Sequence, residues 1–138
     1  MAKIQIRNEV MFKAPTRVGL LADVTERISA VGVNILAIGA YDKGSNGEFL
    51  MITDDSRAAR AALEDLDGEV DTQQVVVAEV PNRPGEIAAI ARKLANQDIN
   101  ISQVFASSTG SAETTMIVLT AERESEVVAL LEQPVVTS

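Results

Sequence analysis

The stretch from residue 80 to residue 101, VPNRPGEIAAIARKLANQDINI, decides the fold of this chain. It has the pattern of a strand end, a tight turn, a helix and the start of a second strand. Pro84 suits the first position of a helix, because its ring fixes φ and its missing N–H is not needed there. Apolar residues then recur on one face at helical spacing, namely Ile87, Ile90, Ala91 and Leu94. The turn at Gly85 is expected to leave the N–H groups of the helix start at the rim of a sheet, where they suit an anion such as a carboxylate.

The same pattern occurs a second time, earlier in the chain. Gly19 corresponds to Gly85 and Asn34 to Asn100 at one common offset (85 − 19 = 66; 100 − 34 = 66). Further identical pairs follow at this offset without a gap: Pro15 and Pro81, Arg17 and Arg83, Ala22 and Ala88, Ile35 and Ile101, Ala40 and Ala106, Gly44 and Gly110, and Ser45 and Ser111. The chain of 138 residues therefore contains an internal duplication. We predict two modules, residues 1–71 and residues 72–138.

Each module is predicted to have the element order β-α-β-β-α-β. In the first module, strands are expected at 4–13, 33–41, 48–53 and 69–71, and helices at 18–31 and 57–66. In the second module, strands are expected at 73–80, 99–106 and 113–120, and helices at 86–96 and 122–132. Val135 and Val136 remain for a last strand. This order predicts an α+β fold of two ferredoxin-like modules, each a four-stranded antiparallel sheet with two helices on one face.

The composition excludes several classes of function. The chain has 20 acidic and 12 basic residues and a net charge of −8, whereas a nucleic acid partner would require a basic surface. It has no cysteine and no histidine, which excludes thiol nucleophiles, disulfides and the usual zinc sites. The first residues alternate between apolar and polar without a long apolar run. We therefore expect no signal peptide, no contact with a membrane and a cytoplasmic protein.

Two asparagines occupy unusual places at the predicted strand starts. Asn34 and Asn100 each follow an apolar residue at a strand entry, where β-propensity disfavours asparagine. An amide donates and accepts hydrogen bonds at once, which suits the amino and carboxylate groups of an amino acid. Asn82 adds a second such group beside Gly85, and Thr16 takes that place in the first module. The alternative is that each strand-entry asparagine caps its own turn, since two copies of a structural turn would look the same.

The motif PNRPGEI at residues 81–87, followed by INI at residues 99–101, resembles the ACT domain, the amino-acid-sensing regulatory module of aspartate kinase, phosphoglycerate dehydrogenase and related enzymes. The segments KAPTRVGL at residues 13–20 and VNI at residues 33–35 are similar, but they lack the asparagine before Arg17 and the proline before Gly19. Together the two resemblances cover nearly the whole chain. They leave no room for a catalytic domain, so we expect no enzyme activity.

The resemblance implies that a ligand lies between two modules, held by the turn of one and the strand-entry asparagine of its neighbour. We expect a small amino acid or a related metabolite at a module or subunit interface, with a homodimer and a metabolic enzyme as further partners, and no cofactor or metal. The N–H groups near Gly85 would bind the carboxylate, while Arg83 would face solvent or pair with an acidic residue. The implied ligand-binding residues are Asn82, Arg83, Pro84, Gly85 and Asn100, with Thr16, Arg17, Val18, Gly19 and Asn34 as a second set. Asn82 and Asn100 would bind the amino and carboxylate groups. The alternative is a ligand-free dimerisation or scaffold module that acts on a partner enzyme.

Three other functions fit the sequence less well. An acylphosphatase-like enzyme shares the strand order and uses an arginine and an asparagine, but it needs a loop of N–H groups around the phosphate, and no glycine-rich loop ends in a suitable arginine here. An RNA-binding sheet would need exposed aromatic residues, and the chain has three Phe and one Tyr. Carboxylate pairs such as Asp54 and Asp55 flank predicted helix starts, so we interpret them as solvated surface and not as metal ligands.

Overall fold

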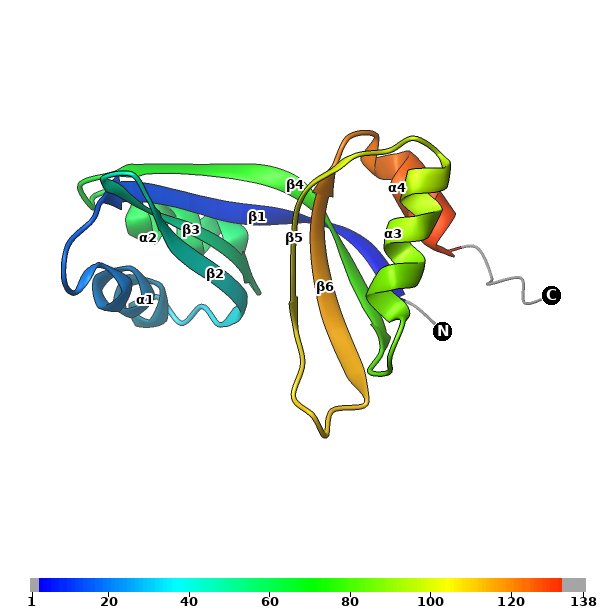
Figure 1. Cartoon of the computed structure of the whole chain (residues 1–138). Coiled ribbons are helices and arrows are strands. Elements are labelled where there is room, and N and C mark those ends of the chain that lie inside the picture. Colours follow the sequence, from blue (N-terminus) through cyan, green and yellow to red (C-terminus); the bar gives the residue numbers. More distant parts are fainter. Residues whose placement is uncertain (1–2, 133–138) are drawn as a thin grey trace. The chain divides into compact units, whose positions relative to one another are not determined.

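The computed structural model describes residues 3–132, which form six strands and four helices (Figure 1). The elements are β1 (Lys3–Pro15), α1 (Leu20–Ala30), β2 (Ile35–Lys43), β3 (Asn46–Thr53), α2 (Ser56–Leu63), β4 (Glu69–Pro81), α3 (Glu86–Asn96), β5 (Ile101–Ser107), β6 (Thr114–Ala121) and α4 (Glu124–Glu132). The hydrogen-bonded strand order is β2-β3-β1-β4-β6-β5. The predicted α+β class is confirmed. Among the described helices, none combines the length and the apolar character needed to cross a membrane.

The chain forms two compact units whose limits differ from the predicted modules. One unit contains residues 8–73, and the other contains residues 3–7 together with residues 74–132. The two short strands expected at 69–71 and 73–80 are one continuous strand, β4, because neither proline nor glycine interrupts it before Pro81. Both β1 and β4 therefore continue from one unit into the other. The predicted last strand at Val135 and Val136 lies outside the described residues.

In the unit of residues 8–73, one face of the sheet packs against α1 and α2. Alternate residues of a strand point to the same face, and in β1 and β3 every second residue points toward the helices. The buried core comprises Val10, Phe12 and Ala14 of β1, Phe49 and Met51 of β3, Leu20, Val24 and Ile28 of α1, and Ala59 and Leu63 of α2. The helices thus lie on one face of this sheet and bury its apolar side.

The other unit repeats this packing with α3 and α4. Its core contains Val76, Ala78 and Val80 of β4, Ile117 and Leu119 of β6, Ile90 and Leu94 of α3, and Val127 and Leu131 of α4. Ile4 packs against this core, and β1 adjoins β4, so residues 3–7 stand where a strand after the last helix was expected. An irregularity in register between Ile35 and Ala37 of β2 recurs between Ile101 and Gln103 of β5. The duplication in sequence is therefore also a repetition of local geometry.

Two left-handed glycines determine where α1 and α3 begin. Gly19 has a φ of 89° and Gly85 a φ of 93°, which a helical residue does not adopt. Consequently α1 begins at Leu20, two residues later than predicted, whereas α3 spans the predicted residues. Pro84 precedes the N-cap and does not hold the first helical position, which corrects the expectation from the sequence.

Candidate functional site

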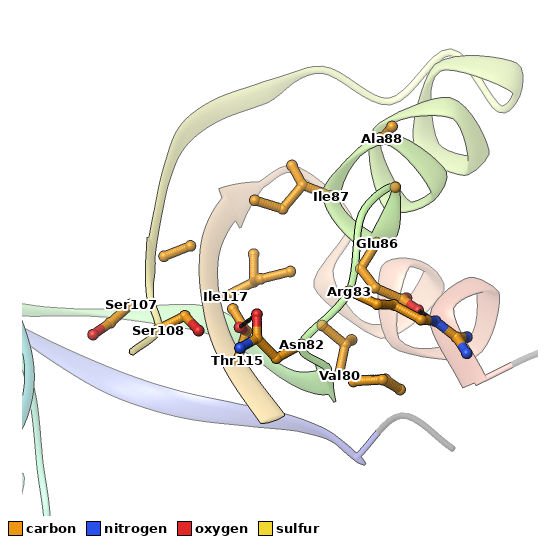
Figure 2. A pocket seen from close by; sticks show the side chains of 13 residues that line it. Val80, Asn82, Arg83, Glu86, Ile87, Ala88, Ser107, Ser108, Thr115 and Ile117 are labelled. Atoms are coloured by element: carbon orange, nitrogen blue, oxygen red, sulfur yellow. Dashed lines mark hydrogen bonds and ion pairs between the residues drawn. The ribbon is translucent and has the colours of Figure 1, made fainter. Parts of the chain in front are cut away.

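A pocket lies beside the start of α3, in the unit that contains residues 74–132 (Figure 2). Its volume is about 330 Å³, within the usual range of small-molecule sites. Of the predicted ligand-binding residues, Asn82, Arg83 and Gly85 line it, whereas Pro84 and Asn100 do not. Apolar walls come from Val80, Ile87 and Ile117, and hydroxyl groups from Ser107, Ser108 and Thr115.

The start of α3 opens into this pocket without a side-chain cap. The N-cap residue is Gly85, so no capping side chain bonds to the first turn, and residues 85–88 line the pocket. The first N–H groups of a helix have no acceptor within the helix, and the helix dipole favours a negative charge beside them. A Cβ added at Gly85 would meet no atom within 4 Å, so this glycine is needed for its backbone conformation and not for space. The pocket therefore offers donors that suit a carboxylate.

Asn82 holds a loop, which differs from the role predicted for it. Its Nδ2 donates to the carbonyl oxygens of Thr109 (3.0 Å) and Ala112 (2.9 Å), and its Oδ1 accepts from Oγ1 of Thr115 at 3.3 Å. Both hydrogens of the amide are therefore in use. Asn82 fixes the loop between β5 and β6 at the edge of the pocket, and its side chain retains acceptor capacity but no donor for a ligand.

The charged side chains beside the α3 pocket neutralise each other. Nε of Arg83 donates to Oε1 of Glu86 at 2.5 Å, and the Arg83 side chain is 68% exposed. Figure 2 shows the guanidinium pointing away from Ser107 and Ser108. Arg83 is thus paired with an acidic neighbour and directed outward. Within residues 3–132, no group of three or more potential metal-ligating side chains is arranged to hold an ion.

Asn34 and Asn100 lie apart from the turns of their own units. Asn100 directly precedes β5, while Ala106 at the far end of that strand lines the pocket, and six strand residues span roughly 20 Å. Both asparagines are exposed, and in the described part of the chain neither side-chain amide makes a hydrogen bond. Asn34 uses its backbone instead, since its N–H donates to Oδ1 of Asp54 at 2.9 Å. The structure therefore gives no side-chain cap at either turn.

A second pocket occupies the equivalent place in the unit of residues 8–73. Its volume is about 310 Å³. Thr16 donates through Oγ1 to Oδ1 of Asp42 at 3.2 Å and through its N–H to the carbonyl oxygen of Ser45 at 2.8 Å, so Thr16 anchors the loop between β2 and β3 as Asn82 anchors the later one. The residues at matching positions of the two pockets are Thr16 and Asn82, Arg17 and Arg83, Leu20 and Glu86, Leu21 and Ile87, Ala40 and Ala106, Tyr41 and Ser107, Asp42 and Ser108, and Phe49 and Thr115.

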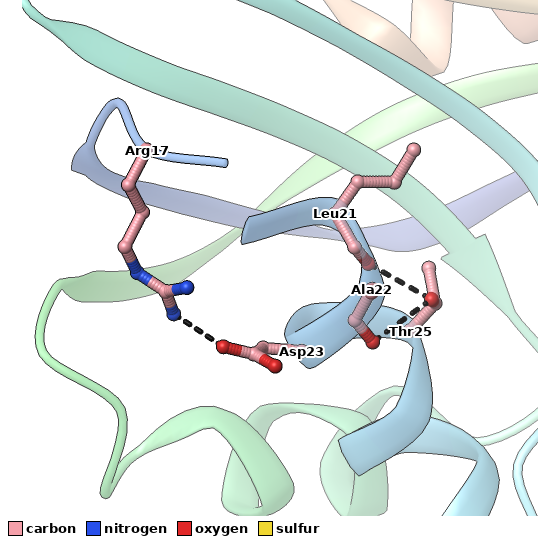
Figure 3. Close-up of polar contacts among 5 residues, drawn as sticks. All are labelled: Arg17, Leu21, Ala22, Asp23 and Thr25. Atoms are coloured by element: carbon pink, nitrogen blue, oxygen red, sulfur yellow. Dashed lines mark hydrogen bonds and ion pairs between the residues drawn. The ribbon is translucent and has the colours of Figure 1, made fainter. Parts of the chain in front are cut away.

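The second predicted set of residues is only partly assembled at this pocket. Thr16 and Arg17 line it, whereas Val18, Gly19 and Asn34 do not. Arg17 forms an ion pair with Asp23 at 2.5 Å (Figure 3), and Thr25 of the same helix donates to the carbonyl oxygens of residues 21 and 22. The arginine of this turn is therefore engaged with its own helix.

Sequence reasoning missed the hydroxyl wall of the α3 pocket. Ser107, Ser108 and Thr115 come from the β5–β6 hairpin, and their approach to the turn at residues 82–85 depends on the pairing of β4 with β6. One signal in the sequence could have found Ser107 and Ser108. They directly follow Ala106, which aligns with Ala40, so the repeat marks the end of this strand as a shared feature of both modules.

The comparisons with known proteins find the same fold in several solved structures. No curated protein matches the sequence. A solved structure of a protein from Bacteroides thetaiotaomicron has a TM-score of 0.84 at 20% identity, covering 94% of this chain and 88% of its own. The ligand-free regulatory subunit of aspartate kinase from Thermus thermophilus has a TM-score of 0.73 at 16% identity, covering 96% of each chain. The corresponding subunit from Thermus flavus has a TM-score of 0.64 at 17% identity, covering 94% of this chain and 92% of its own. At these identities the likeness shows a shared fold.

In sequence, residues 74–133, which contain the α3 pocket, match the ACT domain family.

Proposed function

We propose that this chain is a regulatory protein of two ACT-like modules, residues 1–71 and 72–138, that binds a small amino acid or a related metabolite beside α3. One observation carries the proposal: the uncapped start of α3 opens into a pocket within the segment that matches the ACT domain. The fold is shared with regulatory subunits of aspartate kinase. This likeness supports a protein that regulates a metabolic enzyme and not one that is itself a catalyst.

The proposed binding mode follows from the donors and acceptors of the pocket. The N–H groups of residues 86–88 bind the carboxylate of the amino acid, because they lack acceptors within the helix. The ammonium group meets Oδ1 of Asn82 and the hydroxyls of Ser107 and Ser108, which can accept hydrogen bonds. The side chain of the ligand contacts the apolar walls at Ile87 and Ile117.

Asn100 is proposed to reach this site from a second chain. Within its own unit it is separated from the pocket by the length of β5, whereas its exposed amide is available to a neighbouring copy. Large apolar residues that are exposed at matching positions of both units support a homodimer, namely Leu21 and Ile87, and Ile38 and Val104. These same residues favour the alternative function, a ligand-free assembly module, because an exposed apolar surface can serve dimerisation alone.

A thermal-shift screen against the twenty proteinogenic amino acids tests the proposed function. A ligand at a hundred times its dissociation constant stabilises the native state by about 2.7 kcal/mol, which raises the melting temperature by several degrees. A rise with one amino acid or a chemically related group supports the proposal. A flat result, for protein whose circular dichroism shows it to be folded, contradicts it and favours the assembly module.

A further inference from the structure

We propose that the pocket beside α1 is a second binding site, and that it takes a primary ammonium group carried on a short apolar chain. Its lining combines one carboxylate, one glycine and an apolar wall, namely Asp42, Gly47, Leu20, Leu21 and Phe49. The inference concerns this pocket alone and does not rest on the binding proposed beside α3.

The carboxylate of Asp42 borders a small open space at Gly47. Asp42 pairs with Gly47 across β2 and β3, and Ala40 pairs with Phe49, whose side chain belongs to the core that α1 and α2 cover. Alternate residues of a strand share a face, so Asp42 lies on the side of the helices. A Cβ built on Gly47 would lie 3.7 Å from Oδ1 of Asp42 and 3.7 Å from Cε1 of Phe49. The carboxylate and the apolar wall therefore face one space that the missing side chain of Gly47 leaves open.

Asp42 carries a negative charge without a cationic partner. It forms no ion pair within residues 3–132 and accepts a hydrogen bond from the neutral hydroxyl of Thr16 at 3.2 Å. Arg17, which also lines the pocket, is in an ion pair with Asp23 at 2.5 Å. A carboxylate has about four acceptor sites on its two oxygens. Asp42 therefore keeps acceptor capacity for an ammonium group, and a charge-assisted hydrogen bond of this kind is stronger than one between neutral groups.

The rest of the pocket suits a short apolar chain more than a second charged group. Its volume is about 310 Å³, and the Leu21 side of the wall is 54% exposed, so contact with a ligand chain removes apolar surface from water. A ligand carboxylate finds no unpaired cation among the described lining residues. The N–H of Leu20 at the helix start also donates already to the carbonyl oxygen of Arg17, at 3.3 Å. We therefore expect an amine to bind more tightly than the amino acid that has the same carbon skeleton.

Among its described lining residues, the α3 pocket lacks this combination. Ser108 stands at the position of Asp42 (108 − 42 = 66) and contributes a neutral hydroxyl. Glu113 stands at the position of Gly47 (113 − 47 = 66) and does not line the pocket. The two pockets are therefore expected to differ in ligand class, although the repeat gives them the same place in the fold.

The test is nitrogen–proton correlation NMR of the full chain at neutral pH with three probes: 3-methylbutylammonium chloride, 3-methylbutan-1-ol and leucine. The probes share one carbon skeleton and differ in their charged groups. The ammonium ion should shift the amide signals of residues 42 and 47–49 with saturation. The neutral alcohol should bind about tenfold more weakly, because it lacks the charge, and leucine about threefold more weakly or less well still.

Three variants identify the groups that bind. Asp42→Asn keeps an oxygen acceptor for Thr16 and should weaken binding of the ammonium ion by about tenfold without changing that of the alcohol. Gly47→Ala should weaken binding of both, because its Cβ enters the open space and would lie 3.0 Å from Cδ2 of Leu20, while the backbone of Gly47 is not left-handed. Glu48→Gln is the matched control. It removes one negative charge on the opposite face of β3 and should keep the affinity within about twofold.

The following results would overturn the inference: no saturating shift at residues 42 and 47–49, equal affinities for the ammonium ion and the alcohol, leucine bound as tightly as the amine, or unchanged binding by Gly47→Ala. Equal weakening by Asp42→Asn and Glu48→Gln would also overturn it, because the attraction would then come from the net charge of −8 and not from the pocket. The amide spectra show whether each variant is folded. None of these results bears on the site beside α3, which the thermal-shift screen tests separately.

Discussion

Replacing Gly85 with alanine measures the cost of the backbone conformation that starts α3. Gly85 has a φ of 93°, where the Cβ of an L-residue costs about 1–2 kcal/mol. A Cβ at this position would have no atom within 4 Å, so no packing clash adds to that cost. Alanine also restricts the unfolded chain, but in an incompatible native conformation this gain is outweighed. We therefore expect Gly85→Ala to lower the free energy of unfolding by about 1–2 kcal/mol.

Gly110→Ala is the matched control for this experiment. A Cβ at Gly110 would also have open space, but the backbone there is not left-handed. We expect its free energy of unfolding to stay within about 0.5 kcal/mol of the wild type. Urea unfolding followed by far-ultraviolet circular dichroism measures both variants. If Gly85→Ala proved as stable as Gly110→Ala, the reasoning that the turn requires a left-handed glycine would be refuted.

Three further predictions test other parts of the structure. Burial raises the pKa of Glu9 above its usual 4.5, although a hydrogen bond from Gln73 opposes the shift. As the pH rises, the Glu9 carboxyl therefore ionises in the unfolded chain before it ionises in the folded protein. The free energy of unfolding falls as the pH passes through the unfolded and then the folded pKa of Glu9. Thermal melts should therefore show Glu9→Gln more stable than the wild type at neutral pH, with the advantage lost in acid, and a wild type of equal stability at neutral pH would contradict this. Asn82→Ala should lower the free energy of unfolding by about 1–3 kcal/mol in urea titrations, whereas Asn100→Ala should keep it within about 0.5 kcal/mol and abolish ligand binding; an equal loss of stability in both would mean that Asn100 caps its turn. Val104→Lys places a charge on a residue that is 50% exposed and should shift a dimer toward monomer in sedimentation, and an unchanged dimer would exclude this face as the interface.

The start of α3 could be predicted from local sequence, but the course of the central strands β1 and β4 could not. The glycine that precedes each helix and the apolar spacing after it are local signals, and α3 has its predicted bounds. By contrast, the pairing of β1 with β4 joins residues that are far apart in the chain. Nothing within residues 3–7 indicates that they belong with the unit of α3 and α4.

The candidate site was predictable where a short motif carries it. The turn residues Asn82, Arg83 and Gly85 line the pocket, as the spacing of the motif suggested. The hydrogen bonds of Asn82 to Thr109 and Ala112 could not be predicted, because these two residues lie in a loop whose approach depends on strand pairing. For the same reason Ser107 and Ser108 were missed.

The central claim is that the start of α3 binds the carboxylate of an amino acid. The most direct test is nitrogen–proton correlation NMR of isotope-labelled protein, titrated with each amino acid of the screen, because it reports on individual backbone N–H groups. The account predicts that the amide signals of residues 86–88 shift with saturation while those of residues 20–22 in α1 stay in place. Shifts confined to other residues, or none in any titration, would contradict it.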